Sequence, residues 1–422
     1  MTDLWPAPTA STAVDAVVDV PGSKSMTARA LVLAALASDV TDLHRPLIAR
    51  DTRLMVQALT SLGASVESDG GDWRVTPGPF VGDVDVDCGL AGTVMRFVPA
   101  VAALAAGPVR FDGDAAARLR PMATTVRSLR DLGVEVLDDD RAALPFTVVG
   151  RGAVGGGTIE VDASGSSQFV SALLLAGCRY DEGITVRHVG ASLPSVPHIE
   201  MTLAMVASLG VLVEHPEPML WRVHPGAPKG GTVPVEPDIS NALPFIAAAL
   251  VTGGRVRLPG FPLGSRFQPD AEIRRVLTAL GARLTDDADG LLVEGSGQIH
   301  GIDLDLGAVG EIVPIVAALA ALADSPTTLR GVAHVRGHET DRLAALVKEI
   351  GALGGDITET DDGLRINPRP LHGGVFATYE DHRLATAAAV LGLAVPDIQV
   401  VDVGTTAKTL PGFTGMWDEL LA

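Results

Sequence analysis

The sequence predicts an α/β protein of two domains, built from six copies of one helix–strand unit. Three observations support this prediction. The chain has 422 residues, which is too long for one ordinary hydrophobic core. A helical pattern that ends in Leu-Gly and leads into a short alternating strand recurs along it. A second kind of helix, rich in Ala and apolar on nearly every face, alternates with the first.

The Leu-Gly pattern marks an amphipathic outer helix in each unit. The Gly is placed to end the helix in left-handed backbone, and most copies are followed by a polar turn and a second strand. A spacing of about seventy residues is too long for common solenoid repeats and suits one supersecondary unit. The copies occupy residues 58–66, 128–136, 205–213, 276–284 and 348–357, and a sixth would end at 417–422.

The Ala-rich helices predict the buried centre of each domain. Each one follows a polar segment, so a polar N-terminus leads into an apolar body. Six units fall naturally into two groups of three. The predicted buried helices span residues 26–37, 93–106, 167–176, 240–251, 311–322 and 382–393.

Composition excludes several classes of function. The net charge of −19 argues against nucleic acid or an anionic membrane as the main partner. Cys88 and Cys178 are the two cysteines of the chain, so we expect neither a disulfide framework nor a zinc site. The start of the chain lacks a signal-peptide pattern, and no uninterrupted apolar run approaches ~18 residues. We therefore expect a cytoplasmic protein.

Basic residues beside the polar helix starts indicate anion binding. In PGSKSMTAR, Gly22 allows close backbone approach, Ser23 and Ser25 offer hydroxyl groups, and Lys24 and Arg29 supply positive charge. A helix N-terminus attracts anions through its unpaired N–H groups. The segment lacks the Gly-Lys of a nucleotide P-loop, so a phosphate or carboxylate site is expected. Ordinary N-capping remains an alternative, although it does not explain the cations.

Two acidic positions stand out among further cations. Glu311 opens a predicted helix with an apolar body, where it could cap the helix or act as a general base with a raised pKa. Glu339 and Asp341 are expected in the first turn of a predicted outer helix, where an acid could cap the helix or favour its dipole. Arg342 could form an i,i+3 pair with Glu339. The accompanying cations are Arg96, Arg118, Arg120, Arg383 and Lys408.

Eight sequence motifs span residues 21–413 and read PGSKSMTARALVLAALA, LAGTVMRF, RLRPM, SGSSQF, LPSVPHIEMT, HETDRLAAL, TYEDHRLA and TAKTLPGF. In this order they resemble the motifs of the 5-enolpyruvylshikimate-3-phosphate (EPSP) synthase family. The resemblance implies a two-domain inverse α/β barrel, with three βαβαββ units per domain around buried parallel helices. It places residues 19–238 in one domain and residues 1–18 plus 239–422 in the other, with the active site in the interdomain cleft.

The resemblance also implies a reaction. The enolpyruvyl group of phosphoenolpyruvate would move to the 5-hydroxyl of shikimate 3-phosphate, in the pathway to chorismate and aromatic amino acids. Glu311 would act as base toward the hydroxyl, Glu339 would protonate and deprotonate the methyl carbon, and Lys24 would stabilise charge. No cofactor or metal is implied, a monomer is the family's habit, and glyphosate is expected to compete with phosphoenolpyruvate.

Substrate-binding residues follow from the same resemblance. Shikimate 3-phosphate would contact Lys24, Ser25, Arg29, Ser166, Ser167, Gln168, Ser195, Glu311 and His338. Phosphoenolpyruvate would contact Lys24, Gly92, Arg120, Arg342, Arg383 and Lys408. The chain departs from the usual family residues at Leu90, Phe97, Glu311, His334 and His338.

Two alternatives remain open at this point. UDP-N-acetylglucosamine enolpyruvyl transferases share the fold but carry a reactive Cys in a loop that residues 112–121 match, and this stretch contains no Cys. A non-catalytic anion-binding repeat protein is the other alternative. It would have to explain why Glu311 and Glu339 stand among cations.

Overall fold

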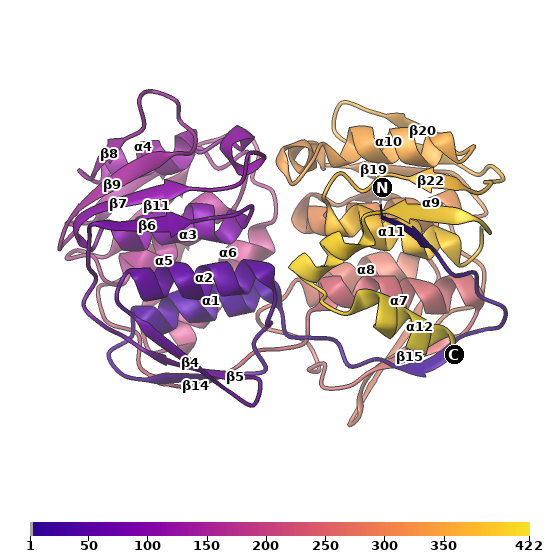
Figure 1. Ribbon diagram of the computed structural model, residues 1–422, viewed down its shortest axis with the longest axis horizontal. Coiled ribbons are helices and arrows are strands. Elements are labelled where there is room, and N and C mark those ends of the chain that lie inside the picture. Colours follow the sequence, from indigo (N-terminus) through magenta and orange to yellow (C-terminus); the bar gives the residue numbers. More distant parts are fainter. Residues whose placement is uncertain (1–2) are drawn as a thin grey trace. The chain divides into compact units, whose positions relative to one another are not determined.

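The structure, a computed structural model, describes residues 3–422, and the chain divides into two compact units (Figure 1). Unit 2 comprises Gly22–Val235. Unit 1 comprises Glu236–Ala422 together with the start of the chain as far as Pro21. Among the described residues, no helix is both long and apolar enough to cross a membrane.

Within Gly22–Val235 the strands form three four-stranded sheets with one shared design. Each sheet has a parallel pair at one edge and two antiparallel neighbours beyond it. In spatial order the sheets are β6 (Val84–Asp87), β7 (Ala106–Asp112), β9 (Phe146–Arg151), β8 (Glu135–Leu137); β10 (Gly157–Val161), β11 (Ile184–His188), β13 (Leu220–Val223), β12 (Val213–Glu217); and β14 (Gly231–Pro234), β3 (Thr41–His44), β5 (Asp72–Thr76), β4 (Ser65–Asp69). The last strand of the unit, β14, pairs with its first, β3, and this pairing closes the unit.

The described part of unit 1 repeats this design with help from the start of the chain. Its sheets are β18 (Asp303–Asp305), β19 (Thr327–Arg330), β21 (Leu364–Asn367), β20 (Asp356–Glu359); β2 (Asp15–Val17), β15 (Arg255–Leu258), β17 (Gly290–Glu294), β16 (Arg283–Asp287); and β22 (Gly374–Phe376), β23 (Ile398–Val401), β1 (Leu4–Pro6). Strand β2 runs parallel to β15, and β1 runs antiparallel to β23. These two pairings explain why the start of the chain belongs to unit 1.

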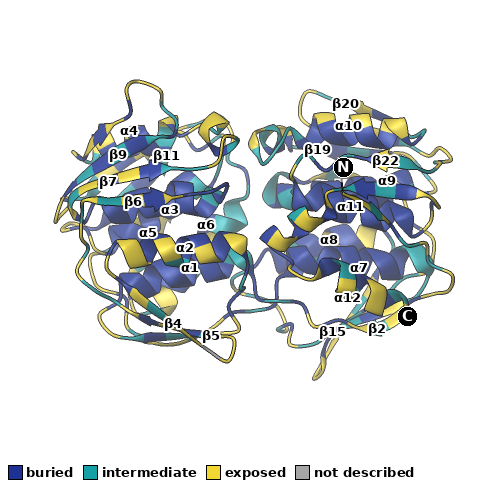
Figure 2. Ribbon diagram, in the orientation of Figure 1, coloured by how far each residue is buried: buried dark blue, intermediate teal, exposed yellow. Residues whose placement is uncertain are grey.

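Buried and outer helices alternate along the chain, as the sequence predicts (Figure 2). The buried helices are α1 (Lys24–Ala35), α3 (Gly92–Ala102), α5 (Gln168–Gly177), α7 (Ile239–Thr252), α9 (Val313–Ala321) and α11 (His382–Gly392). The outer helices are α2 (Arg50–Ser61), α4 (Ala123–Asp131), α6 (Val196–Ser208), α8 (Asp270–Ala279), α10 (Arg342–Ala352) and α12 (Phe413–Leu421). The predicted helix-ending glycines all have positive φ, namely Gly63, Gly133, Gly210, Gly281 and Gly354.

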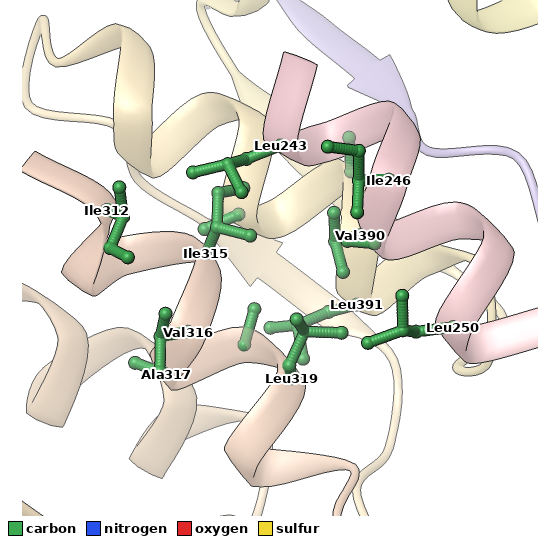
Figure 3. Close-up of a cluster of buried hydrophobic side chains, with 14 of the residues drawn as sticks. Leu243, Ile246, Leu250, Ile312, Ile315, Val316, Ala317, Leu319, Val390 and Leu391 are labelled. Atoms are coloured by element: carbon green, nitrogen blue, oxygen red, sulfur yellow. The ribbon is translucent and has the colours of Figure 1, made fainter. Parts of the chain in front are cut away.

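The core of unit 1 forms where its three buried helices meet (Figure 3). Side chains of α7, α9 and α11, among them Leu243, Ile315 and Leu391, are almost entirely removed from solvent. Burial of one such side chain stabilises the fold by about 1.5–3 kcal/mol relative to its exposed state. The side chains where α7, α9 and α11 meet are apolar, so the polar residues that begin these helices lie at the helix ends.

The prediction that Glu311 opens an α-helix is wrong. Glu311 lies in a 3₁₀ helix, Gly307–Ile312, and α9 begins only at Val313. Pro314 has no N–H to donate, so it fits the first turn of an α-helix and α9 begins beside it. Val309, with φ −135° and ψ 40°, interrupts the helical backbone before Glu311. The chain has three further 3₁₀ helices within residues 3–422, at Ala117–Leu119, Ala333–Gly337 and Val403–Lys408.

Candidate active site

The guanidinium of Arg29 lies inside unit 2, where the first turns of α1, α5 and α6 meet. It donates hydrogen bonds to the Ser25 carbonyl (3.0 Å), the Ser171 hydroxyl (3.3 Å) and the Thr202 hydroxyl (2.8 Å). A fourth bond reaches the His198 carbonyl at 3.0 Å. Burial lowers the pKa of Arg29 to about 9, which leaves it protonated at neutral pH. All four acceptors are uncharged, so its charge remains available to an anionic ligand.

Lys24 is the first residue of α1 and is held by an acidic side chain of α2. Ser23 caps the helix by accepting a hydrogen bond from the Met26 N–H at 3.4 Å. The Lys24 ammonium lies 3.5 Å from a carboxylate oxygen of Asp51, which is buried in the first turn of α2. The sequence prediction assigned no role to Asp51. An acid in the first turn of a helix is usually satisfied by the helix dipole, so sequence alone does not reveal this pairing.

Gly92 brings the start of α3 against two guanidinium groups. A Cβ at this position would lie 2.8 Å from Nη1 of Arg96 and 3.1 and 3.2 Å from Nη1 and Nη2 of Arg120. Arg96 donates to the side-chain oxygen of Gln168 at 3.1 Å, which joins the first turn of α3 to that of α5. Arg120 donates to the Leu90 carbonyl at 3.4 Å. Because Gly92 has no side chain, the guanidinium groups of Arg96 and Arg120 can both lie close to the backbone at the start of α3.

The predicted serine cluster lies at the starts of α5 and α6. Ser167 is buried at the N-cap of α5, and the Ser166 hydroxyl accepts a hydrogen bond from the Gln168 N–H at 3.3 Å. Ser195 is the N-cap of α6 and has left-handed backbone, with φ 53° and ψ 42°. These are the two helices whose first turns hold the Arg29 side chain. Unit 2 thus gathers hydroxyl groups, helix N-termini and cations at one end of its buried helices.

Arg342 is the centre of the charged cluster in unit 1. Its Nε and Nη2 donate to both carboxylate oxygens of Asp381, at 2.8 and 3.2 Å. Nη2 also donates to Glu339 at 2.9 Å, and Nη1 lies 2.9 Å from Nδ1 of His338, which accepts the bond. Burial alone lowers the pKa of Arg342, but Asp381 and Glu339 outweigh burial and raise it above its ordinary value. Arg342 therefore stays charged.

Glu339 is bound by two cations of this cluster. One carboxylate oxygen accepts from Arg342 and the other accepts from the Lys408 ammonium at 2.9 Å. The i,i+3 pairing of Glu339 with Arg342 is confirmed. The expectation that Glu339 belongs to the first turn of the outer helix is wrong, because Asp341 caps α10 through a 3.1 Å bond from the Ala344 N–H. Glu339 thus precedes the helix and turns toward the cations.

Arg383 and Glu311 complete the cluster. Arg383 donates to the Ser240 carbonyl at 2.6 Å, and its N–H bonds Asp381 at 2.8 Å. Burial lowers the pKa of Arg383, and the nearby Asp238 opposes this change. Glu311 attracts both Arg342 and Arg383 electrostatically. The structure therefore brings the site residues predicted in unit 1 into one network: Glu311, His338, Glu339, Arg342, Arg383 and Lys408.

The sequence prediction assigned no role to Asp381, yet this carboxylate orients the cluster. It is fully buried, caps α11, and joins Arg342 to the start of the helix that carries Arg383. Its position directly before His382 in TYEDHRLA was visible in the sequence. The motif gave no sign of its partner, because Arg342 stands 39 residues earlier.

Three side chains that depart from the residues expected at their positions lie close to the charged groups of the two clusters. The ring of Phe97 lies 5.2 Å from the guanidinium carbon of Arg29, within cation–π range. The rings of His334 and His338 lie edge to face with their centres 5.7 Å apart, and His338 also contacts Arg342. Burial lowers the pKa of His334, and Glu311 opposes this change. The departures at Phe97, His334 and His338 therefore affect the surroundings of the charged residues.

Solved structures share the fold of this chain. An EPSP synthase from Acinetobacter baumannii matches with a TM-score of 0.82 and 24% identity, covering 100% of this chain and 98% of that one. The enolpyruvyl transferase NikO from Streptomyces tendae matches with a TM-score of 0.77 and 19% identity, covering 98% and 96%. The fold is that of the enolpyruvyl transferases, and the predicted fold class is confirmed.

Sequence comparison gives the family. The family model for EPSP synthase (3-phosphoshikimate 1-carboxyvinyltransferase) matches residues 8–417. A 3-phosphoshikimate 1-carboxyvinyltransferase from Kocuria rhizophila is 54% identical, covering 99% of this chain and 97% of the relative. The chain belongs to the EPSP synthase family.

Proposed function

We propose that the chain transfers the enolpyruvyl group of phosphoenolpyruvate to the 5-hydroxyl of shikimate 3-phosphate and releases phosphate. The product is 5-enolpyruvylshikimate 3-phosphate, in the pathway to chorismate and aromatic amino acids. Family membership and the 54% identical relative support this activity. They do not favour UDP-N-acetylglucosamine as acceptor, and residues 112–121 lack the cysteine of that family.

Shikimate 3-phosphate binds where hydroxyl groups and cations meet the starts of buried helices. The proposed contacts are Lys24, Ser25, Arg29, Ser166, Ser167, Gln168, Ser195, Glu311 and His338. Helix N-termini and serine hydroxyls suit phosphate oxygens, because each supplies a donor directed at the anion. The buried charge of Arg29, surrounded by uncharged acceptors, supports this placement.

Phosphoenolpyruvate carries a carboxylate and a phosphate, so its site needs several cations. The proposed contacts are Lys24, Gly92, Arg120, Arg342, Arg383 and Lys408. Arginine forks bind carboxylate and phosphate groups through paired hydrogen bonds. The close approach of Gly92 to Arg120 supports the placement of these two residues against one ligand.

The contacts of Glu339 are the observation that carries the mechanism. Each of its carboxylate oxygens accepts a hydrogen bond from one cation of the proposed phosphoenolpyruvate set, Arg342 or Lys408. The anionic groups of phosphoenolpyruvate compete for both donors. Substrate binding thereby frees the carboxylate of Glu339 for proton transfer at the methyl carbon.

The reaction then proceeds by addition and elimination. Glu311 takes the proton of the 5-hydroxyl as the hydroxyl oxygen bonds to C2 of phosphoenolpyruvate, while Glu339, which takes up a proton from water once its two cations bind the substrate, delivers that proton to C3. In the second step Glu339 takes a proton back from C3, the C2–O bond to phosphate breaks, the enol ether forms, and the proton held by Glu311 leaves with the phosphate. Lys24 stabilises the charge of the departing phosphate.

Both domains supply substrate contacts under this proposal. We assign residues 19–238 to one domain and residues 1–18 plus 239–422 to the other, each a half of the enolpyruvyl transferase fold. The enzyme works as a cytoplasmic monomer on small-molecule substrates. The net charge of −19 would repel an anionic substrate from the surface as a whole, so these substrates need a local cationic site.

Phosphate release tests the function directly. The protein is incubated with phosphoenolpyruvate and either shikimate 3-phosphate or UDP-N-acetylglucosamine, and the product is identified by mass spectrometry. Release with shikimate 3-phosphate alone is expected, and Glu339→Gln should abolish most of it. Release with the sugar nucleotide alone would overturn the assignment. Release with neither acceptor would favour a non-catalytic anion-binding protein.

A further inference from the structure

Helix α10 is tied at two places to the segment that leads into α11. At its first residue, Arg342 bonds both carboxylate oxygens of Asp381. About two turns farther along, Glu349 accepts hydrogen bonds from the Ala377 N–H at 2.9 Å and the Tyr379 hydroxyl at 2.5 Å. The first contact involves Arg342, which is proposed to bind phosphoenolpyruvate. The second contact has no part in the mechanism above. The second tie therefore needs its own explanation.

The segment between the two ties has an unfavourable backbone. Tyr379 and Glu380 have φ of 53° and 59°, and the Asp381 N–H bonds the Thr378 carbonyl at 2.9 Å. Two consecutive positive φ values in a four-residue turn are typical of a type I′ turn, for which Asn-Gly is the preferred pair. Neither central residue here is Gly, so both Cβ atoms crowd the backbone. Such a turn persists only where surrounding contacts hold it.

Glu349 and its neighbour Lys348 provide these contacts. The Glu349 carboxylate is buried and bonds one residue before the turn and one within it. The Lys348 ammonium lies 5.2 Å from the centre of the Tyr379 ring. Burial and the bond to Glu349 raise the pKa of Tyr379, while Lys348 opposes them. The phenol therefore remains a protonated donor at neutral pH.

The turn ends at the residue that orients the cations. Asp381 follows Glu380 directly and bonds Arg342 on one side and the Arg383 N–H on the other. A change in the turn would rotate Asp381 and move the guanidinium of Arg342 with it. We propose that Glu349 and Tyr379 are positioning residues for phosphoenolpyruvate binding, because they hold the turn that keeps Asp381 against Arg342. This inference rests on the proposed role of Arg342.

A single hydroxyl deletion tests the inference. Tyr379→Phe keeps the ring beside Lys348 and removes only the bond to Glu349. Loss of one such bond is expected to raise the KM for phosphoenolpyruvate about three- to tenfold. The KM for shikimate 3-phosphate should stay within about twofold, because Asp381 bonds groups assigned to phosphoenolpyruvate and reaches the shikimate 3-phosphate set only through the bond from Arg342 to His338. Glu349→Gln should produce the same selective change and provides a second test if Tyr379→Phe folds poorly.

A glycine in the turn supplies the rescue. Glu380 is exposed, and Gly adopts positive φ without strain, so Tyr379→Phe combined with Glu380→Gly should restore the KM for phosphoenolpyruvate. Glu380→Gly alone serves as the matched control and should behave as wild type. Equal changes in both KM values, or a lower Tm with an unchanged KM for phosphoenolpyruvate, would overturn the inference. Wild-type protein that releases no phosphate would instead refute the proposed function.

Discussion

Replacement of Gly92 by Ala is a sharp test of the cation site at the start of α3. The added methyl group would lie 2.8 Å from Nη1 of Arg96 and 3.1 and 3.2 Å from the terminal nitrogens of Arg120. Ordinary contacts of a Cβ atom begin at 3.4 Å, so the overlaps are several tenths of an ångström. Either a guanidinium group or the helix start must shift.

Arg120 is the group expected to move. Arg96 is buried, bonds Gln168 and lies over the Phe169 ring at 5.4 Å. Arg120 has a longer bond, 3.4 Å, to a backbone carbonyl. Relief of the Arg120 overlap needs a shift of about 0.3 Å (3.4 − 3.1). Since a misplacement of about 1 Å can cost about 100-fold in catalysis, this shift should cost about fourfold. This corresponds to about 0.8 kcal/mol of binding free energy.

Steady-state phosphate release measures the effect. In Gly92→Ala the KM for phosphoenolpyruvate should rise about fourfold, and inhibition by glyphosate, which we expect to compete with phosphoenolpyruvate, should weaken. Gly155→Ala is the matched control in the same unit, because a Cβ at that exposed position meets no atom within 4 Å. Wild-type KM and wild-type glyphosate inhibition in Gly92→Ala would refute the placement of Arg120 beside Gly92.

Three other changes probe the cluster in unit 1. Asp381→Asn leaves the buried charge of Arg342 poorly paired, so the free energy of unfolding should fall by about 3 kcal/mol in urea titrations; an unchanged midpoint would contradict the pairing. Glu339→Gln should lower kcat about 100-fold or more and also lower Tm, because the buried ammonium of Lys408 loses its carboxylate partner; near-normal kcat would exclude Glu339 from proton transfer. Burial lowers the pKa of His334, so its contribution to stability is complete above pH 6.5 and is lost as the pH falls below that value. His334→Asn should therefore lose less stability than wild type between about pH 7 and about pH 5, and parallel pH profiles would contradict this.

The repeat architecture could be predicted from the sequence because its signals are local. A Leu-Gly pair ends each outer helix through left-handed backbone at the Gly, as at Gly63, and this requires no knowledge of distant residues. An apolar helix body predicts burial in the same way. Pro314 is a sequence signal for the start of α9 that the prediction overlooked, since proline favours the first turn of a helix. The 3₁₀ helix that holds Glu311 could not be predicted, because it depends on the backbone of Val309.

The site was predictable as a set of motifs but not as a set of contacts. Lys24 and Arg342 could be predicted as site residues from their motifs, because each is a basic residue beside a recognisable helix start. The motifs did not give Asp51 or Asp381, the acids that hold these cations. Each acid also stands at a helix start, where a cap or dipole role accounts for it locally. Its long-range partner is a property of the folded chain.

Central to the proposed function is the proposal that phosphoenolpyruvate is bound by cations of unit 2 and by cations of unit 1. The most direct measurement is the KM for phosphoenolpyruvate in Arg120→Lys, from unit 2, and Arg383→Lys, from unit 1. Lysine keeps the charge but loses the paired donors of the guanidinium, so each variant should raise this KM about tenfold or more. A wild-type KM in either folded variant would contradict the claim.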